Sequence, residues 1–584
     1  MRAARGWKLP VLLAGVLLLG VVLWGVWLVV RTSTDLAAAA DDARTLQTAV
    51  TDGDAAAADA ALASLQDHAA SAAGRTDGPL WSVMTWTPFV GDDLEGVRAV
   101  STVLDDLAQD GLAPLVETAG NLETLSPRDG QVDLDAVAAL QEPVARGNAA
   151  FQRAVAELDE HDSEGYVGVV RDQYREVVSE VGSAARVLDS ADRAAQVMPS
   201  MLGADGPRQY LLIFQNNAEI RAGGGLPGSA ALVTAVDGKI ELARQVAGNS
   251  FGMTDEPVLP LTDAEDEIWN RQLGTYFLDA NFTPDFPRSA ELWQARWEQE
   301  YEPVDGVIAI DPVTLSYVLG AVGPIEVPGG PTLTSDNLVD ELLHEVYLRY
   351  DDPAQQDAYF NAAAARTFDA LAAGGGNPRQ LVEALGRGVN EGRVKLHSFD
   401  ETEQAVVAGT RIAGELVTDP DDAHPQVGVY LNDTTGAKMS YFLRHEVHVT
   451  ATSCARGEQR LSGRAYLLSD APADAASLPD YVTGAGLFGI EPGKQLVSVQ
   501  IIGPVGGTIN DVTFNDEPYV GTPTVDLDGR PVQTVLAFLD PGFTADIRWT
   551  MTTGRDQPGT VQVNTTAGVE PGDLSSTAAS ACRS

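Results

Sequence analysis

Two short segments carry residue types that could bind a phosphate group. In the first, Arg221 is closely followed by three consecutive glycines, Gly223, Gly224 and Gly225. A glycine-rich turn lets backbone N–H groups approach a ligand, and a guanidinium can donate two parallel hydrogen bonds to phosphate oxygens. We therefore predict a phosphate site at Arg221 and this glycine loop. The alternative is a tight connection in which Arg221 pairs with Glu219.

The second segment places an arginine beside two carboxylates. Arg349 is separated by one residue from Asp351 and Asp352, and carboxylate oxygens are ligands that suit Mg²⁺ or Mn²⁺. We predict Arg349 as a further phosphate ligand and the two aspartates as metal ligands. The alternative is that Asp352, which precedes a proline, caps the N-terminus of a solvent-exposed helix.

The usual catalytic signatures give little support for an enzyme. The sequence has no His-Glu-x-x-His and no Walker-type phosphate loop. His445 and His448 lie three residues apart on a predicted strand, so their side chains point to opposite faces and no shared metal ion is expected. The sequence leaves open whether the protein is an enzyme, and it predicts no catalytic residue.

Charge and cysteine content narrow the class of protein. The formal net charge is -45, from 83 acidic and 38 basic residues. This charge repels polyanions and no basic patch offsets it, so nucleic-acid binding is not expected. Cys454 and Cys582 fit an oxidising compartment that permits one disulfide, which would tie down the C-terminus. The alternative is two unpaired thiols.

The N-terminus predicts a membrane anchor. Arg2, Arg5 and Lys8 precede an uncharged apolar run at residues 11–30, and a spanning helix needs ~20 such residues. By the positive-inside rule, the N-terminus would be cytoplasmic and the bulk of the chain extracytoplasmic. The alternative is a cleaved signal peptide. Because the apolar core of a signal peptide usually has only ~7 to 15 residues, the pattern favours a single-pass anchor in the cell membrane.

Composition divides the chain into four parts. Residues 1–31 form the cytoplasmic tip and anchor. Residues 32–201 are rich in Ala, Asp, Glu and Leu with helical spacing of apolar residues, which predicts a helical-bundle stalk. We expect the stalk to be a spacer, the alternative being a partner-binding module. Strand-like runs alternate with helices over residues 202–425, which indicates an α/β domain. Residues 426–584 predict an immunoglobulin-like β-sandwich.

Short elements of the α/β domain would position the glycine loop. The apolar run Tyr210–Phe214 predicts a buried strand that ends before the loop, and Ala231–Val236 predicts the next strand. Asp237-Gly238 is typical of a hairpin turn. Arg221 and the glycines are therefore expected at one end of a sheet.

Three runs resemble the signature of a family of bacterial membrane-anchored proteins of unknown function. They are FQNNAEIRAGG at residues 214–224, NFTPDFP at 281–287 and LNDTTGAKM at 431–439. The resemblance extends over essentially the whole chain after the anchor. It implies no particular reaction.

A more distant resemblance suggests a ligand. The runs at 304–311, 319–327 and 349–352 resemble those of LytR-CpsA-Psr cell-wall transferases. This likeness implies an α/β domain that binds a polyprenyl-pyrophosphate-linked glycopolymer, usually with a divalent metal, and transfers it to peptidoglycan. The chain departs from that family's pattern at 226–229 and 355–357, where expected charged residues are replaced.

The leading hypothesis is a protein that binds a polyprenyl-linked or cell-wall glycan intermediate and assists its export or attachment. If it is an enzyme, it would be a glycopolymer phosphotransferase. The rival hypothesis is a non-catalytic envelope scaffold that contacts other proteins or glycan. An apolar cavity that ends at the arginines favours the first hypothesis. Arginines held in structural ion pairs beside a filled core favour the second.

Overall fold

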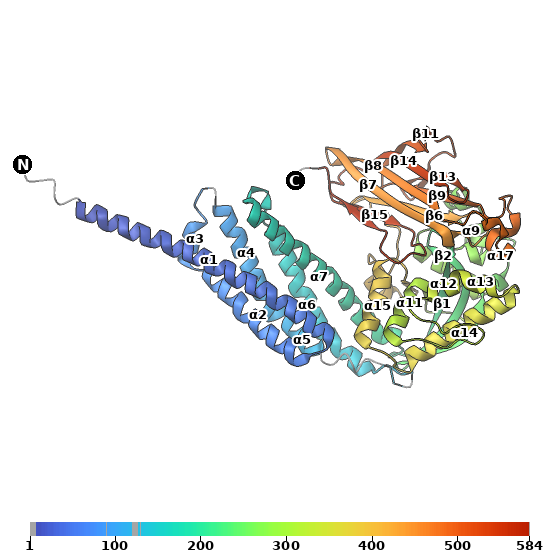
Figure 1. Cartoon of the computed structure of the whole chain (residues 1–584), viewed down its shortest axis with the longest axis horizontal. Coiled ribbons are helices and arrows are strands. Elements are labelled where there is room, and N and C mark those ends of the chain that lie inside the picture. The colour runs from blue at the N-terminus through green and yellow to red at the C-terminus, as the bar shows by residue number, and fades with distance from the viewer. Residues whose placement is uncertain (1–7, 89, 120–126, 129, 583–584) are drawn as a thin grey trace, which may run out of the picture. The chain divides into compact units, whose positions relative to one another are not determined.

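The computed structural model describes residues 8–88, 90–119, 127–128 and 130–582 (Figure 1), and the side chains of residues 8–23 and of Ala119 lie outside this description. The chain forms two compact units. Unit 1 comprises Met1–Ser126 and Asp133–Pro199, and unit 2 comprises Pro127–Val132 and Ser200–Ser584.

Every element assigned in the described part of unit 1 is a helix. Alanines pack at one helix contact, around Leu65 and Ala69, and larger side chains such as Phe151 and Tyr174 fill a second core. Small residues let neighbouring helices approach closely, and each helix buries one stripe of its surface. The helices are α1 (Lys8–Asp52), α2 (Ala55–Thr76), α3 (Pro79–Met84), α4 (Gly91–Asp106), η1 (Leu107–Gly111), α5 (Leu112–Ala119), α6 (Leu134–Asp159), η3 (Ser163–Gly165) and α7 (Gly168–Met201).

The predicted membrane-spanning helix is not supported. Within the described residues, we find no helix that combines the length and the apolar character of a membrane span. The side chains of residues 11–23, which belong to the predicted span, lie outside the description. Helix α1 then continues through Arg31 and Asp35. The single-pass anchor, the cytoplasmic N-terminus and the extracytoplasmic bulk were predicted from this helix and are corrected with it.

A five-stranded mixed sheet forms the centre of the α/β part of unit 2. Its strand order is β3-β2-β1-β4-β5, with β1 and β4 parallel and the other neighbours antiparallel. Leu211 and Ile213 point into the core on one face, whereas Phe214 packs into the core on the other. The strands are β1 (Arg208–Arg221), β2 (Gly224–Val236), β3 (Lys239–Ala247), β4 (Gly306–Ile310) and β5 (Lys395–Ser398).

Helices cover both faces of this sheet. Trp293 and Trp297 of α10 pack against the Leu211 face, and Leu319 and Tyr347 belong to the core on the other face. The result is a layered α/β/α arrangement. The helices are η4 (Gly248–Phe251), α8 (Asp263–Trp269), α9 (Gln272–Thr275), η5 (Phe277–Asp279), α10 (Phe286–Trp297), α11 (Pro312–Val322), α12 (Leu338–Asp340), η6 (Glu341–Glu345), α13 (Val346–Arg349), α14 (Pro353–Ala372), α15 (Pro378–Asn390) and α16 (Glu401–Val407).

Strand β1 is longer than the predicted run and includes Arg221. It stays paired with β2 across an irregular stretch in which Asn216 pairs with Leu226 and Ile220 with Gly225, so residues 217–219 form a wide bulge. The sequence predicted a strand end here because Asn and Glu are poor strand formers. The strand continues because these polar side chains find partners inside the protein.

The β-rich part of unit 2 consists of two sheets around one core. Their strand orders are β11-β10-β14-β8-β7 and β12-β13-β9-β6-β15-β16, and Val499 of one sheet shares a core with Trp549 of the other. Cys454 and Cys582 form a disulfide that joins β7 to the C-terminal segment. The elements are β6 (Gln426–Asp433), η7 (Met439–Phe442), β7 (Leu443–Ala455), β8 (Glu458–Ser469), η8 (Ala475–Ser477), α17 (Asp480–Thr483), η9 (Gly484–Gly486), β9 (Gln495–Ile502), β10 (Thr508–Phe514), β11 (Glu517–Pro518), β12 (Val525–Leu527), β13 (Arg530–Leu539), β14 (Thr544–Thr552), β15 (Val561–Thr565) and β16 (Ser576–Ala578).

Candidate functional site

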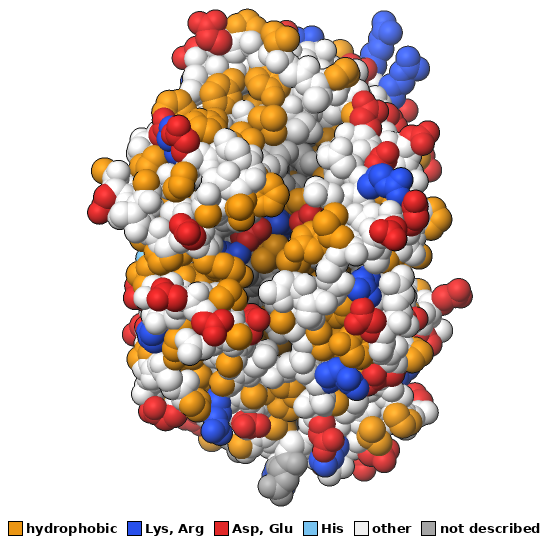
Figure 2. Space-filling view, turned by 90° about the vertical axis from the view of Figure 1, so that its right-hand side faces the viewer, with side chains coloured by type: hydrophobic (Ala, Val, Ile, Leu, Met, Phe, Trp, Pro, Cys, Tyr) orange, Lys and Arg blue, Asp and Glu red, His pale blue; other side chains and the backbone are white. Residues whose placement is uncertain are grey.

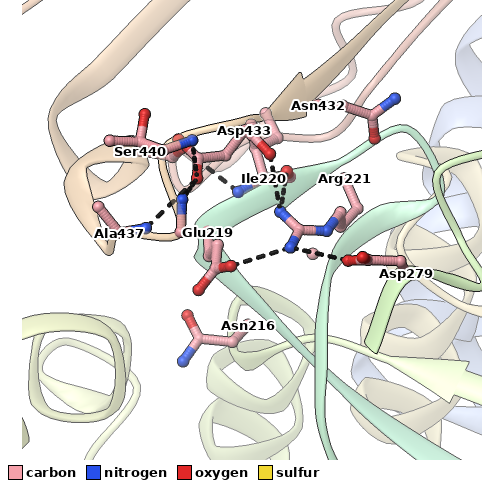
Figure 3. Close-up of polar contacts among 12 residues, drawn as sticks. Asn216, Glu219, Ile220, Arg221, Asp279, Asn432, Asp433, Ala437 and Ser440 are labelled. Atoms are coloured by element: carbon pink, nitrogen blue, oxygen red, sulfur yellow. Dashed lines mark hydrogen bonds and ion pairs between the residues drawn. The ribbon is translucent and has the colours of Figure 1, made fainter. Parts of the chain in front are cut away.

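A buried cluster of charged side chains lies at the end of strand β1 (Figure 3). Arg221 is at its centre and is 4% exposed. Its Nη2 donates to Glu219 at 2.9 Å and to Asp279 at 3.3 Å, and its Nη1 donates to the carbonyl oxygens of Ile220 and Asp433. The pairing of Arg221 with Glu219 is the alternative considered from the sequence. Asp279 and Asp433 come from distant segments.

Lys438 is the second cation of the cluster. Its Nζ donates to the carboxylate of Glu219 and lies 5.2 Å from the ring centroid of Tyr481. Burial opposes the charge on Lys438, but the adjacent Glu219 raises its pKa above the ordinary value. Burial also opposes ionisation of Glu219, yet Lys438 and Arg221 together lower its pKa. Glu219 therefore stays ionised and bridges the two cations.

Two further carboxylates give the cluster a net negative charge. Burial raises the pKa of Asp279 to about 6 against the opposing effect of Arg221, and burial with the nearby charge of Glu219 raises the pKa of Asp433 to about 6. Above this pH, three carboxylates face the cations Arg221 and Lys438, a sum of minus one.

The glycine loop is packed against the protein itself. A Cβ on Gly223 would lie 2.9 Å from the Cβ of Asn281, and a Cβ on Gly224 would lie 2.4 Å from the side-chain oxygen of Gln215. On Gly225, a Cβ would meet the backbone of β1 at 2.4 Å. These glycines allow the β1–β2 hairpin to close tightly against its neighbours.

The structure does not bring Arg349 into the Arg221 cluster. Its guanidinium pairs with Glu341 at 2.6 Å. Asp352 accepts a hydrogen bond from the N–H of Ala354 and caps the N-terminus of α14, which is the alternative considered from the sequence. Across the described ranges, no group of three or more His, Cys, Asp or Glu side chains is placed to hold a metal ion. The donor set around Asp351 and Asp352 thus does not fit the predicted Mg²⁺ or Mn²⁺.

A second buried ion network escaped prediction. Arg393 is buried and donates to Asp311 at 2.8 Å and to Glu391 at 2.7 Å, and it also binds carbonyl oxygens in segment 568–570. The only sequence signal was the pair Asp311-Pro312, which is typical of a helix start. Nothing in the spacing of Arg393 marks it as buried.

A Gly-x-Ser-x-Gly motif is present at η4, contrary to the expectation that the sequence contains none. Residues 248–252 read Gly-Asn-Ser-Phe-Gly, the spacing of a hydrolase nucleophile elbow. Ser250 is exposed, and its hydroxyl donates to the carbonyl oxygen of Ala247 at 2.6 Å. In the described part of the chain no histidine or carboxylate forms a hydrogen bond with Ser250, so the geometry provides no activated nucleophile.

A cavity of about 100 Å³ lies between the sheet and the helices α11 to α14. Asn216, Lys438 and Tyr481 are among its lining residues, so the cavity borders the charged cluster. The face shown in Figure 2 is hollowed near its middle, with charged side chains inside the hollow and hydrophobic ones around it. Apolar side chains form most of the cavity wall, among them Phe214, Leu226, Leu315, Leu338, Leu342, Leu343 and Phe360.

Comparison with known protein families identifies one domain in the chain. Residues 205–347 match a family described as protein of unknown function (DUF4012). The matched segment includes Glu219, Arg221 and Asp279, and the expected resemblance to a family of unknown function is confirmed for this segment. No curated protein and no solved structure matches the chain. The likeness to LytR-CpsA-Psr transferases stays a prediction.

Proposed function

We propose that the protein binds an amphipathic ligand of the polyprenyl-linked or cell-wall glycan class and holds its apolar chain in the cavity under α14. The observation that carries this proposal is the composition of the cavity wall. Most of the lining side chains are apolar, mainly leucine and phenylalanine. The polar ones include Asn216, Ser229 and Asp357. A site of this kind binds apolar groups and orients them with a few polar contacts.

The cavity volume limits how much of a chain can enter. At about 100 Å³, it is smaller than the ~150 Å³ cavity that admits benzene. It therefore accommodates a short apolar segment of a ligand, not an entire polyprenyl chain. The remainder of the ligand would lie outside the cavity.

The class of ligand rests on the resemblance to the LytR-CpsA-Psr transferases. Phosphate binding by Arg221, by Gly223, Gly224 and Gly225, and by Arg349 stays a prediction. The proposal does not depend on phosphate binding, because Arg221 is already paired with carboxylates of the protein itself. We accordingly restrict the proposed function to binding.

Titration of the full chain with geranyl β-D-glucoside tests this proposal. Ala364 lines the cavity, so Ala364→Phe would fill it, whereas Ala358 is an exposed residue of the same helix and Ala358→Phe is the matched control. We expect calorimetric binding to the wild type and to the control, with at least about tenfold weaker binding to Ala364→Phe. Equal binding to all three proteins would contradict the proposal.

A scaffold is the second candidate function. The ion pairs of Arg221 and Arg349 support a scaffold, because a purely structural arginine is expected to be paired with a carboxylate of the protein itself. Under this alternative the cavity is a packing defect, and geranyl β-D-glucoside would not bind to the wild type.

A further inference from the structure

Asp357 is an unpaired carboxylate in the cavity wall. It lies on α14, is half-buried and lines the cavity, and within the described residues it makes neither an ion pair nor a hydrogen bond. Burial raises the pKa of Asp357, and no neighbouring cation opposes this effect. The other charged residue of the wall, Lys438, is bound to Glu219. The unsatisfied charge of the cavity is therefore negative.

The path of α14 along the edge strand β3 shows where Asp357 lies. Ala365, Phe368 and Asp369 of the helix line a groove with residues 240–243 of the strand. Further along, the side-chain amide of Gln245 donates to the carbonyl oxygen of Asn361. Towards the N-terminus of α14, the helix therefore lies beside residues closer to the C-terminal end of β3. Asp357, one helical turn before Asn361, is consequently placed towards the end of β3.

Two neutral polar side chains follow at this end of the strand pair. Ser229, which pairs with Ala247 at the end of β3, and Asn249, just beyond it, also line the cavity. A carboxylate only accepts hydrogen bonds, whereas a hydroxyl and an amide both donate and accept. Together they suit a head group rich in hydroxyl groups, because hydroxyls can satisfy all three side chains.

We infer that Asp357, Ser229 and Asn249 form a head-group subsite of the cavity that selects a hydroxyl-bearing, uncharged head, such as a sugar, over a phosphate. This inference rests on the proposed binding function and specifies that the glycan part of the ligand, and not a phosphate, lies next to α14. The carboxylate accepts hydrogen bonds from sugar hydroxyls, and it repels a phosphate because like charges placed close together are unfavourable.

Two probes with the same chain test the selectivity. Octyl β-D-glucoside and octyl phosphate are titrated into the full chain by calorimetry. Each probe is kept below its critical micelle concentration. We expect the glucoside to bind at least about tenfold more tightly. Asp357→Asn should bring the two affinities within about threefold of each other, mainly by strengthening phosphate binding. The exposed Asp351, which is not part of the cavity wall, gives the matched control Asp351→Asn, and this variant should keep the wild-type ratio.

The outcomes separate the subsite from the binding function. If octyl phosphate binds the wild type as tightly as the glucoside, or if Asp357→Asn keeps the wild-type ratio, the subsite is refuted while the cavity remains a binding site. If neither probe binds the wild type, both proposals fail. The comparison of the two probes on the wild type decides the inference even if Asp357→Asn does not fold.

Discussion

Replacing Arg221 with methionine should strongly destabilise the protein, whereas the same change at Arg349 should have little effect. Methionine keeps much of the aliphatic stem, so the comparison isolates the charged group. At Arg221 the side chains of the pair with Glu219 are 5% and 7% exposed. Loss of the guanidinium leaves Glu219 with Lys438 alone and leaves Asp279 without its cation.

The expected magnitudes follow from burial. Removing one partner of a buried ion pair costs ~3–5 kcal/mol, because the remaining charge is left unpaired in the interior. The guanidinium also lies 4.8 Å from the ring centroid of Phe282, a contact that adds ~0.5–2 kcal/mol. Arg349 has a side chain that is 29% exposed, and partly exposed pairs contribute ~0–1 kcal/mol.

Urea unfolding of the full-length variants, followed by tryptophan fluorescence, measures the difference. Trp269, Trp293, Trp297 and Trp549 are buried in unit 2 and report on its unfolding. We expect the unfolding free energy of Arg221→Met to fall by at least ~3 kcal/mol and that of Arg349→Met to change by under ~1 kcal/mol. If the two variants differ by less than ~1 kcal/mol, the structural role assigned to the Arg221 cluster is refuted.

Three further predictions concern stability. Burial raises the pKa of Asp279 from 3.8 to about 6. The folded protein therefore binds the proton of this carboxyl group more tightly than the unfolded chain does. The contribution of Asp279 to the unfolding free energy consequently rises as the pH falls from above 6 towards 4. Asp279→Asn should lose that gain, which urea unfolding of both proteins at about pH 7.5 and about pH 4.5 would detect; an identical pH response would contradict it. Reduction of the Cys454–Cys582 disulfide, which links residues 128 positions apart, should lower the unfolding free energy by up to about 4–5 kcal/mol in the chain-entropy picture, and an unchanged urea midpoint in dithiothreitol would argue against it. Trp293→Ala should cost ~3–5 kcal/mol because the side chain is fully buried, and thermal unfolding at the wild-type temperature would refute this expectation.

Periodicity predicted the helical and strand character of the chain after residue 31, and it fell short where tertiary contacts override it. The helical spacing in residues 32–201 and the alternation of strands and helices after Arg208 both appear in the structure. The length of β1 could not be predicted, because its polar residues Asn216, Asn217, Glu219 and Arg221 are stabilised by side chains from remote segments. The apolar character of residues 11–30 predicted a membrane span that no described helix provides.

The candidate site shows the same limit. Glu219 was identified as a partner of Arg221 because the two are close in sequence and come from one strand. Lys438 is 219 residues away from Glu219 along the chain, and only the fold brings them together. The cavity is likewise assembled from segments between Phe214 and Tyr481. No local motif contains the information that such a cavity exists.

Mass spectrometry of what co-purifies with the full chain tests the central claim most directly. Organic extracts of wild type, Ala364→Phe and the control Ala358→Phe would be compared. The account predicts that an amphipathic compound with a prenyl-type chain and a glycan head is present with the wild type and the control and is lost from Ala364→Phe. Extracts in which no such compound is found with the wild type, or in which Ala364→Phe retains it at the wild-type level, would contradict the account.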